Sequence, residues 1–267
     1  MRLFELEAVG GPLAKRLARR RQGTEHLAWG ELAPLATTPA GEHARGVWTQ
    51  SAFSEYASAA SFADITGGLL AAGAPIDLCA AAGDFVLDEI LHAELSSQIA
   101  MTLGGAVPLE VDLARLVRPP TSDTPLARVA ELVVRTCCVG ESLTIALLQA
   151  SRESAGAPVI AEVIGRIVRD EAEHAELGWT FLDWAADRLS DDELSALGQV
   201  ATGAVASFAP VFMRECAGDG SLGVMSCATY DAAFVKALQR RVDEPLRARG
   251  IEIAPDVLEH ITALARG

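Results

Sequence analysis

Two eight-residue segments of this chain, at residues 88–95 and 170–177, have the same residue at six of their eight positions. Each copy contains Glu-x-x-His. Because residues three apart on a helix lie on the same face, each copy can direct a carboxylate and an imidazole at one point. These groups are common ligands of divalent transition metals. The ligand pairs predicted in this way are Glu89 with His92 and Glu171 with His174.

The repetition argues against chance. The other three histidines of the chain, His26, His43 and His260, do not have Glu three positions earlier. With Glu at about one position in twelve, two such pairs among five histidines would arise by chance roughly one time in twenty. The two copies also share flanking Asp, Ala and Leu residues, which makes a common structural role the better interpretation.

Helices are expected to position these pairs. Half of the residues are hydrophobic, only 5% are aromatic, and Ala is abundant, which favours helices over strands. Gly and Pro mark turns between the helical segments, and a Pro-rich link at 108–125 suits a long crossover between two hairpins. The helices predicted for the two hairpins are Val47–Ala72, Ile76–Leu103, Leu126–Ser154 and Val159–Leu189.

The predicted fold class is therefore all-α: a four-helix bundle of two antiparallel hairpins with extra helices at both ends. Ser190 and Glu193 form a capping-box pattern that opens a fifth helix. Later helices are expected at about 230–249 and from Pro255. We divide the chain into an N-terminal extension (1–46), the bundle (47–211) and a C-terminal helical accessory segment (212–267).

A carboxylate-bridged two-metal site in such a bundle takes one further Glu from each of the other two helices. That Glu must be level with the Glu-x-x-His pair of its hairpin partner, which means equally far from the turn. With the second turn near Gly156, Glu141 and Glu171 are level. Glu131 would lie about 15 Å out of level at the helical rise, and Glu153 would lie almost at the turn.

The same comparison applies to the first hairpin, whose turn is near Gly73. Glu55 is nearly as far from this turn as Glu89, whereas Asp64 is much closer to it. Glu55 is therefore the predicted ligand from the first helix. The complete predicted set is Glu55, Glu89, His92, Glu141, Glu171 and His174.

Four buried carboxylates would repel one another unless they were protonated or bound to cations, and two divalent ions would balance their charge. Mixed oxygen and nitrogen ligands favour iron, with manganese as the alternative, over structural zinc. By symmetry, Glu89 and Glu171 would bridge the two ions. Asp88 and Asp170 precede the bridging residues, and each is expected either to accept the ring N–H of a ligand His or to be a plain surface acid.

The order Glu55, Glu89-x-x-His92, Glu141, Glu171-x-x-His174 resembles the ferritin-like di-iron carboxylate superfamily over about 47–189. Radical-bearing ribonucleotide reductase small subunits have Tyr where this chain has Ser96, and arylamine N-oxygenases have a third His where it has Ile167. The resemblance implies two iron ions, O2 as co-substrate, and an external electron donor, either a protein or a small reductant.

On this basis we predict an O2-dependent non-haem di-iron oxidase or oxygenase that acts on a small, partly apolar organic substrate. The alternatives are ferritin-like iron oxidation and storage, peroxide scavenging, and a bundle whose acids and histidines are only structural. Thr144 and Cys137 lie one helical turn on either side of Glu141 and are candidates to line the oxygen or substrate pocket, with core packing as the alternative.

A net charge of −14 argues against a nucleic-acid partner. No apolar segment of membrane-spanning length occurs, and the five cysteines lack C-x-x-C spacing. We therefore expect a cytoplasmic protein without a membrane partner and with reduced thiols. A homodimer is one oligomeric state that the sequence allows.

Overall fold

The computed structural model describes residues 1–19, 23–24, 26–212, 218 and 220–265. The described chain is mostly helical, which confirms the all-α prediction. Its only sheet among these residues is one short antiparallel pair, β1 (Arg2–Leu3) with β2 (Glu110–Val111).

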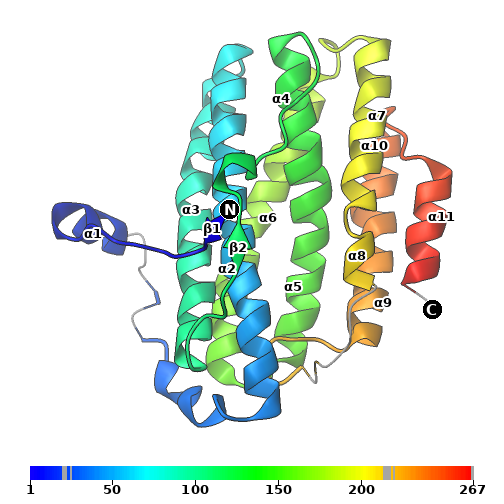
Figure 1. Ribbon diagram of the computed structural model, residues 1–267. Helices are drawn as coiled ribbons and strands as arrows, with labels where there is room; N and C mark the ends of the chain where they lie inside the picture. Colours follow the sequence, from blue (N-terminus) through cyan, green and yellow to red (C-terminus); the bar gives the residue numbers. More distant parts are fainter. Residues whose placement is uncertain (20–22, 25, 213–217, 219, 266–267) are drawn as a thin grey trace.

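Two helical hairpins form the body of the molecule (Figure 1). In the first hairpin, α2 packs along α3 with a short turn between them. In the second, a long helix that contains a π-helical segment packs against α6, and α6 also contacts α3. The segments are α2 (Pro39–Ala71), α3 (Ile76–Thr102), α4 (Pro125–Val133), η5 (Val134–Glu141), α5 (Ser142–Ser154) and α6 (Pro158–Ala185).

Helix α2 begins at Pro39, so the prediction that the first bundle helix starts at Val47 is wrong. The side chain of Thr38 accepts a hydrogen bond from the amide of Gly41, and Pro39 occupies the first helical turn. A Thr cap followed by Pro is a strong helix start, because the cap satisfies a free amide and Pro lacks one. Residues 39–46 therefore belong to the bundle helix and not to the predicted extension.

The third long helix is not α-helical throughout. Between α4 and α5, residues 134–141 form a π-helix, η5, which the sequence analysis did not predict. The hydroxyl of Ser142 donates a hydrogen bond of 3.3 Å to the carbonyl of Cys137, five residues earlier. Glu141 is the last residue of η5, so the irregular segment ends at a predicted metal ligand.

The crossover between the hairpins runs along the outside of the bundle (Figure 1). Glu131 fixes its end. Its carboxylate accepts hydrogen bonds from the backbone amides of Thr121 (3.0 Å to Oε2) and Ser122 (2.6 Å to Oε1). The remaining short elements before α4 are α1 (Gly11–Ala18), η2 (Trp29–Glu31), η3 (Ala33–Leu35) and η4 (Leu113–Arg115). Helix α1 projects from the bundle and has no buried residue.

The C-terminal helices cover the outer side of the third helix, since α7 contacts η5 and α9 contacts α5. The predicted capping box at Ser190 and Glu193 is confirmed at the start of α7. Two boundaries differ from prediction: α6 ends at Ala185 rather than Leu189, and α9 begins at Cys227 after the cap Ser226. The C-terminal elements are α7 (Asp191–Ala206), α8 (Ala209–Phe212), α9 (Cys227–Ala237), η6 (Leu238–Asp243), α10 (Glu244–Arg247) and α11 (Pro255–Leu264).

A loop at 220–225 connects this layer back to the hairpins. The indole N–H of Trp48 donates a hydrogen bond of 2.9 Å to the carbonyl of Leu222, and the hydroxyl of Ser151 donates one of 2.6 Å to the carbonyl of Gly223. Gly223 has φ of 77° and approaches Trp48 closely. Only a residue without Cβ fits this turn without strain.

The apolar core consists of two clusters along the bundle. In α3, buried apolar residues up to Phe85 belong to one cluster and those from Leu91 onward to the other. In α6, the division falls between Ile167 and Leu177. Both Glu-x-x-His pairs lie between the two clusters, so the polar site is closed off by apolar packing on either side.

The prediction that all cysteines are reduced is wrong for Cys227, which is disulfide-bonded. The sequence offered no spacing pattern that would have identified a disulfide, because such a bond depends on two chain segments meeting in space. Cys79, Cys137 and Cys138 are free and buried, and Cys216 lies outside the described residues. Across the described ranges, no helix combines the length and apolar character that crossing a membrane requires.

Candidate metal centre

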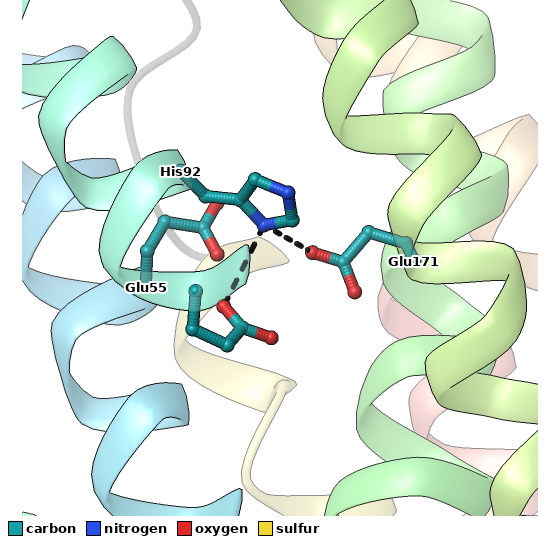
Figure 2. A group of neighbouring side chains, drawn as sticks. Glu55, His92 and Glu171 are labelled. Carbon is teal, nitrogen blue, oxygen red and sulfur yellow. Dashed lines mark ion pairs between the residues drawn. The ribbon is translucent and has the colours of Figure 1, made fainter. Parts of the chain in front are cut away.

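The structure brings the six predicted ligand residues together in the middle of the bundle. They form two overlapping groups, and within each group one ligand atom per residue lies within 4.8 Å of the others. Figure 2 shows Glu55 and His92 facing Glu171 across the bundle. The groups are Glu55, Glu89, His92 and Glu171, and Glu89, Glu141, Glu171 and His174.

Glu89 and Glu171 belong to both groups and divide their oxygens between the two histidines. Glu89 directs Oε2 toward Nδ1 of His92 at 3.7 Å and Oε1 toward Nδ1 of His174 at 3.1 Å. Glu171 directs Oε1 toward His92 at 3.1 Å and Oε2 toward His174 at 2.9 Å. Each shared carboxylate therefore has one oxygen beside each imidazole, which is the arrangement required of a carboxylate that bridges two cations.

The site is enclosed on most sides. Glu89, His92, Glu171 and His174 have no exposed surface, Glu141 is 5% exposed, and Glu55 is half-buried. The rings of Phe62 and Phe85 pack against His174, with centroids 4.9 Å and 4.2 Å from the imidazole. This apolar packing fixes the orientation of the His174 ring.

Burial alone would lower the pKa of both histidines, but acidic neighbours outweigh it. The nearby carboxylates of Asp88, Glu171 and Glu89 raise the pKa of His174 to about 12. A hydrogen bond with Asp170 and the nearby carboxylates of Glu171 and Glu89 raise the pKa of His92 well above its ordinary value. Without a cation the acidic neighbours therefore favour the protonated form of both imidazoles.

The carboxylates of the centre differ in the direction of their pKa shifts. Burial, and then repulsion from Glu89 and Glu171, raises the pKa values of Glu55 and Glu141 well above the ordinary range. Burial also acts to raise the pKa of Glu171, but its bonds with His174 and His92 prevail and lower it. Protons thus balance part of the acidic charge, and metal binding would have to displace them.

The acids that precede the two bridging residues lie against the histidines of the opposite motif. Oδ2 of Asp170 is 3.2 Å from Nε2 of His92, and Oδ2 of Asp88 is 3.8 Å from Nε2 of His174. Since the Nε2 atoms face these acids, the Nδ1 atoms face the shared carboxylates. Arg166 donates a hydrogen bond of 2.7 Å from Nε to Oδ2 of Asp170, a contact that the sequence analysis missed.

The donor set fits a pair of metal ions. Both oxygens of Glu89, Oε1 of Glu171 and Nδ1 of His92 are buried, and their close contacts with one another and with His174 lack the geometry of a hydrogen bond. A buried polar atom without a partner costs free energy, and a bound cation would remove that cost. Among the described residues, five of the seven buried side-chain atoms of this kind belong to the two ligand groups, and the other two are Nε of Arg45 and Oγ of Ser96.

Cys137 lies beside the centre, and Thr144 is half-buried on α5. Burial raises the pKa of the Cys137 thiol, and repulsion from Cys138 and from the acids Glu141, Glu89 and Glu171 adds to the effect. That either residue lines a substrate pocket stays a prediction.

The acids that we rejected as ligands lie elsewhere. Asp64 and Glu153 are exposed, and Glu131 binds the crossover. The two partners in this contact are close in the sequence, because Glu131 follows the Thr-Ser pair at 121–122 by only about ten residues. Their meeting depends on how the link folds back, which spacing alone does not reveal.

Comparisons of this chain with protein-family models, with curated proteins and with solved structures found no match.

Proposed function

We propose that this chain is a ferritin-like non-haem di-iron protein that acts as an O2-dependent oxidase or oxygenase on a small, partly apolar organic substrate. The observation that carries the proposal is the division of the Glu89 and Glu171 oxygens between His92 and His174. Two hairpins, each with one Glu-x-x-His helix and one Glu helix, correspond to the ligand pattern of that class.

In this proposal Glu55 and His92 would hold one ion, Glu141 and His174 would hold the other, and Glu89 and Glu171 would contribute to both. A bound iron pair would supply the O2 chemistry, with electrons from an external donor. The protein positions the ligands, keeps bulk water away through the apolar clusters, and orients His92 through Asp170. Manganese is the alternative metal, because it accepts the same hard oxygen ligands.

The helices and the loop that cover the bundle favour an enzyme over a storage protein. The C-terminal helices α7 and α9 cover the third helix, and the loop at 220–225 contacts both hairpins through Trp48 and Ser151. Added layers around a single bundle can shape a substrate site, which an iron store does not need. Iron oxidation and storage and peroxide scavenging remain the alternative functions.

Anaerobic loading with ferrous iron, followed by metal analysis and O2 uptake, tests the proposal. We expect about two iron ions per chain and consumption of O2 by the loaded protein. The matched control is Glu173→Gln, which changes an exposed acid one position from His174 and should keep both properties. Iron far above this ratio in a large oligomer would indicate storage, and the absence of stoichiometric metal would refute a metal centre.

A further inference from the structure

A second polar site lies next to the candidate metal centre. A cavity of about 210 Å³ is formed where an N-terminal segment meets α3, α5 and α6. Leu95 and Val163 provide apolar wall, while Arg152, Arg166 and Arg169 bring three guanidinium groups to the same space. These residues come from separate elements, so tertiary packing creates the cluster.

The charge of this cavity is opposite to that of the protein. The chain has 36 acidic residues against 22 Lys and Arg, and its net charge is −14. Glu162 is the only acid among the described lining residues, and its Oε2 lies 3.4 Å from Nε2 of His26. Within the described structure, the side chains of Arg152 and Arg169 make no ion pair. Two neighbouring cations without an ion-pair partner, Arg152 and Arg169, favour the binding of an anion.

Gly165 creates the space that Arg152 occupies. This glycine is buried in α6, and a Cβ at its position would lie 2.9 Å from Nε and 3.1 Å from Cζ of Arg152. Any larger residue would therefore push the guanidinium away from the helix. The planar guanidinium is suited to bidentate recognition of carboxylate or phosphate oxygens.

We propose that this cavity is a binding site for a carboxylate or phosphate group, held by Arg152 and Arg169 with Arg166 at its inner wall. Arg166 already donates to Oδ2 of Asp170, the atom that lies 3.2 Å from His92. The anion site is thus connected to a candidate metal ligand through two polar contacts. Binding of the anion does not depend on the metal, so this proposal and the di-iron proposal can fail separately.

Calorimetric titration of the full-length protein with inorganic phosphate, and separately with acetate, at constant ionic strength tests the proposal. We expect saturable binding of at least one of the two anions. Arg152→Ala should weaken it about tenfold or more, because a charge-assisted contact is lost. Gly165→Ala should also weaken binding, since it displaces Arg152 without removing a charge. Arg115→Ala changes an exposed arginine that pairs with Asp112, and it should leave the affinity unchanged.

Circular dichroism would verify that each variant is folded. Tighter binding of phosphate would identify a phosphorylated ligand, and tighter binding of acetate would identify a carboxylate. Absence of saturable binding for both anions would overturn the proposal. So would an Arg152→Ala or Gly165→Ala protein that binds as tightly as the wild type.

Discussion

Asp170 of the second motif contacts His92 of the first, with Oδ2 of the acid 3.2 Å from Nε2 of the imidazole. The contact joins α6 to α3 at the level of the candidate metal centre. Bonds with His92 and Arg166 outweigh the effect of burial and lower the pKa of Asp170, so this acid is ionised at neutral pH. It therefore holds the His92 ring with Nδ1 toward the shared carboxylates.

Replacing Asp170 should weaken metal binding without removing a ligand. Asp170→Asn leaves the side-chain shape but removes the charge that orients His92, and loss of such a partner typically costs about 10–100-fold in metal affinity. Competition with a chelator of known affinity measures the effect. Glu173→Gln, an exposed change in the same helix, serves as the control. Equal affinities in the two variants would contradict an orienting role for Asp170.

The shared and unshared acids should differ in metal stoichiometry. Glu89 belongs to both ligand groups, whereas Glu55 belongs to one. We expect Glu89→Ala to lose both ions and Glu55→Ala to retain about one ion per chain. Metal analysis after removal of unbound iron, with circular dichroism to verify folding, makes the comparison. Identical stoichiometry in both variants would argue against bridging by Glu89.

Gly178 allows the π-helical segment to approach α6. A Cβ at Gly178 would lie 2.7 Å from Cβ of Cys137 and 2.9 Å from Sγ of Cys138. Gly178→Ala should therefore destabilise the fold by about 1–3 kcal/mol through overpacking and should displace η5. Since η5 ends at Glu141, we also expect weaker binding of the metal ion that Glu141 and His174 would hold.

Urea unfolding and metal titration measure both effects of Gly178→Ala. The matched control is Gly67→Ala, because Gly67 is exposed in α2 and no atom lies within 4 Å of an added Cβ. That substitution should stabilise the protein by about 0.5–1 kcal/mol through helix propensity. A Gly178→Ala protein as stable as the wild type would show that the packing of η5 against α6 leaves room for a Cβ at this position.

Glu131 should stabilise the crossover in a pH-dependent way. Burial acts to raise its pKa, but hydrogen bonds from Ser122 and Thr121 prevail and lower it below the ordinary value. A lowered folded-state pKa means that the stabilisation is full above the unfolded pKa of about 4.5 and is lost as the pH falls through the folded value. Glu131→Ala should cost about 2 kcal/mol at pH 7.

Unfolding by urea at a series of pH values tests this linkage. The difference in unfolding free energy between the wild type and Glu131→Ala should shrink as the pH is lowered below about 4.5. Glu153→Ala, a change at an exposed acid of α5, should show little difference at any pH. A wild-type advantage that is constant with pH would contradict the contribution of the ionised carboxylate.

The sequence by itself determined the helical class and the set of residues that meet at the centre. Hydrophobic patterning and Gly and Pro turns define helices of known rise, and equal distance from a turn places two residues of a hairpin side by side. That is why counting from Gly73 and Gly156 selected Glu55 and Glu141 over Asp64 and Glu131. The capping box at Ser190 and the helix start at Thr38–Pro39 also depend only on a few consecutive residues, so both can be identified from sequence. Of the two, only the capping box was predicted.

Only the tertiary structure decided which oxygen faces which imidazole, and that Asp170 contacts the His of the other motif. It also decided the π-helical form of residues 134–141, the docking of the crossover on Glu131, and the arginine cavity beside Gly165. These features join groups on different helices, or depend on how one helix packs against another. Periodicity within a single segment carries no information about such contacts, because they arise only when the faces of separate helices meet.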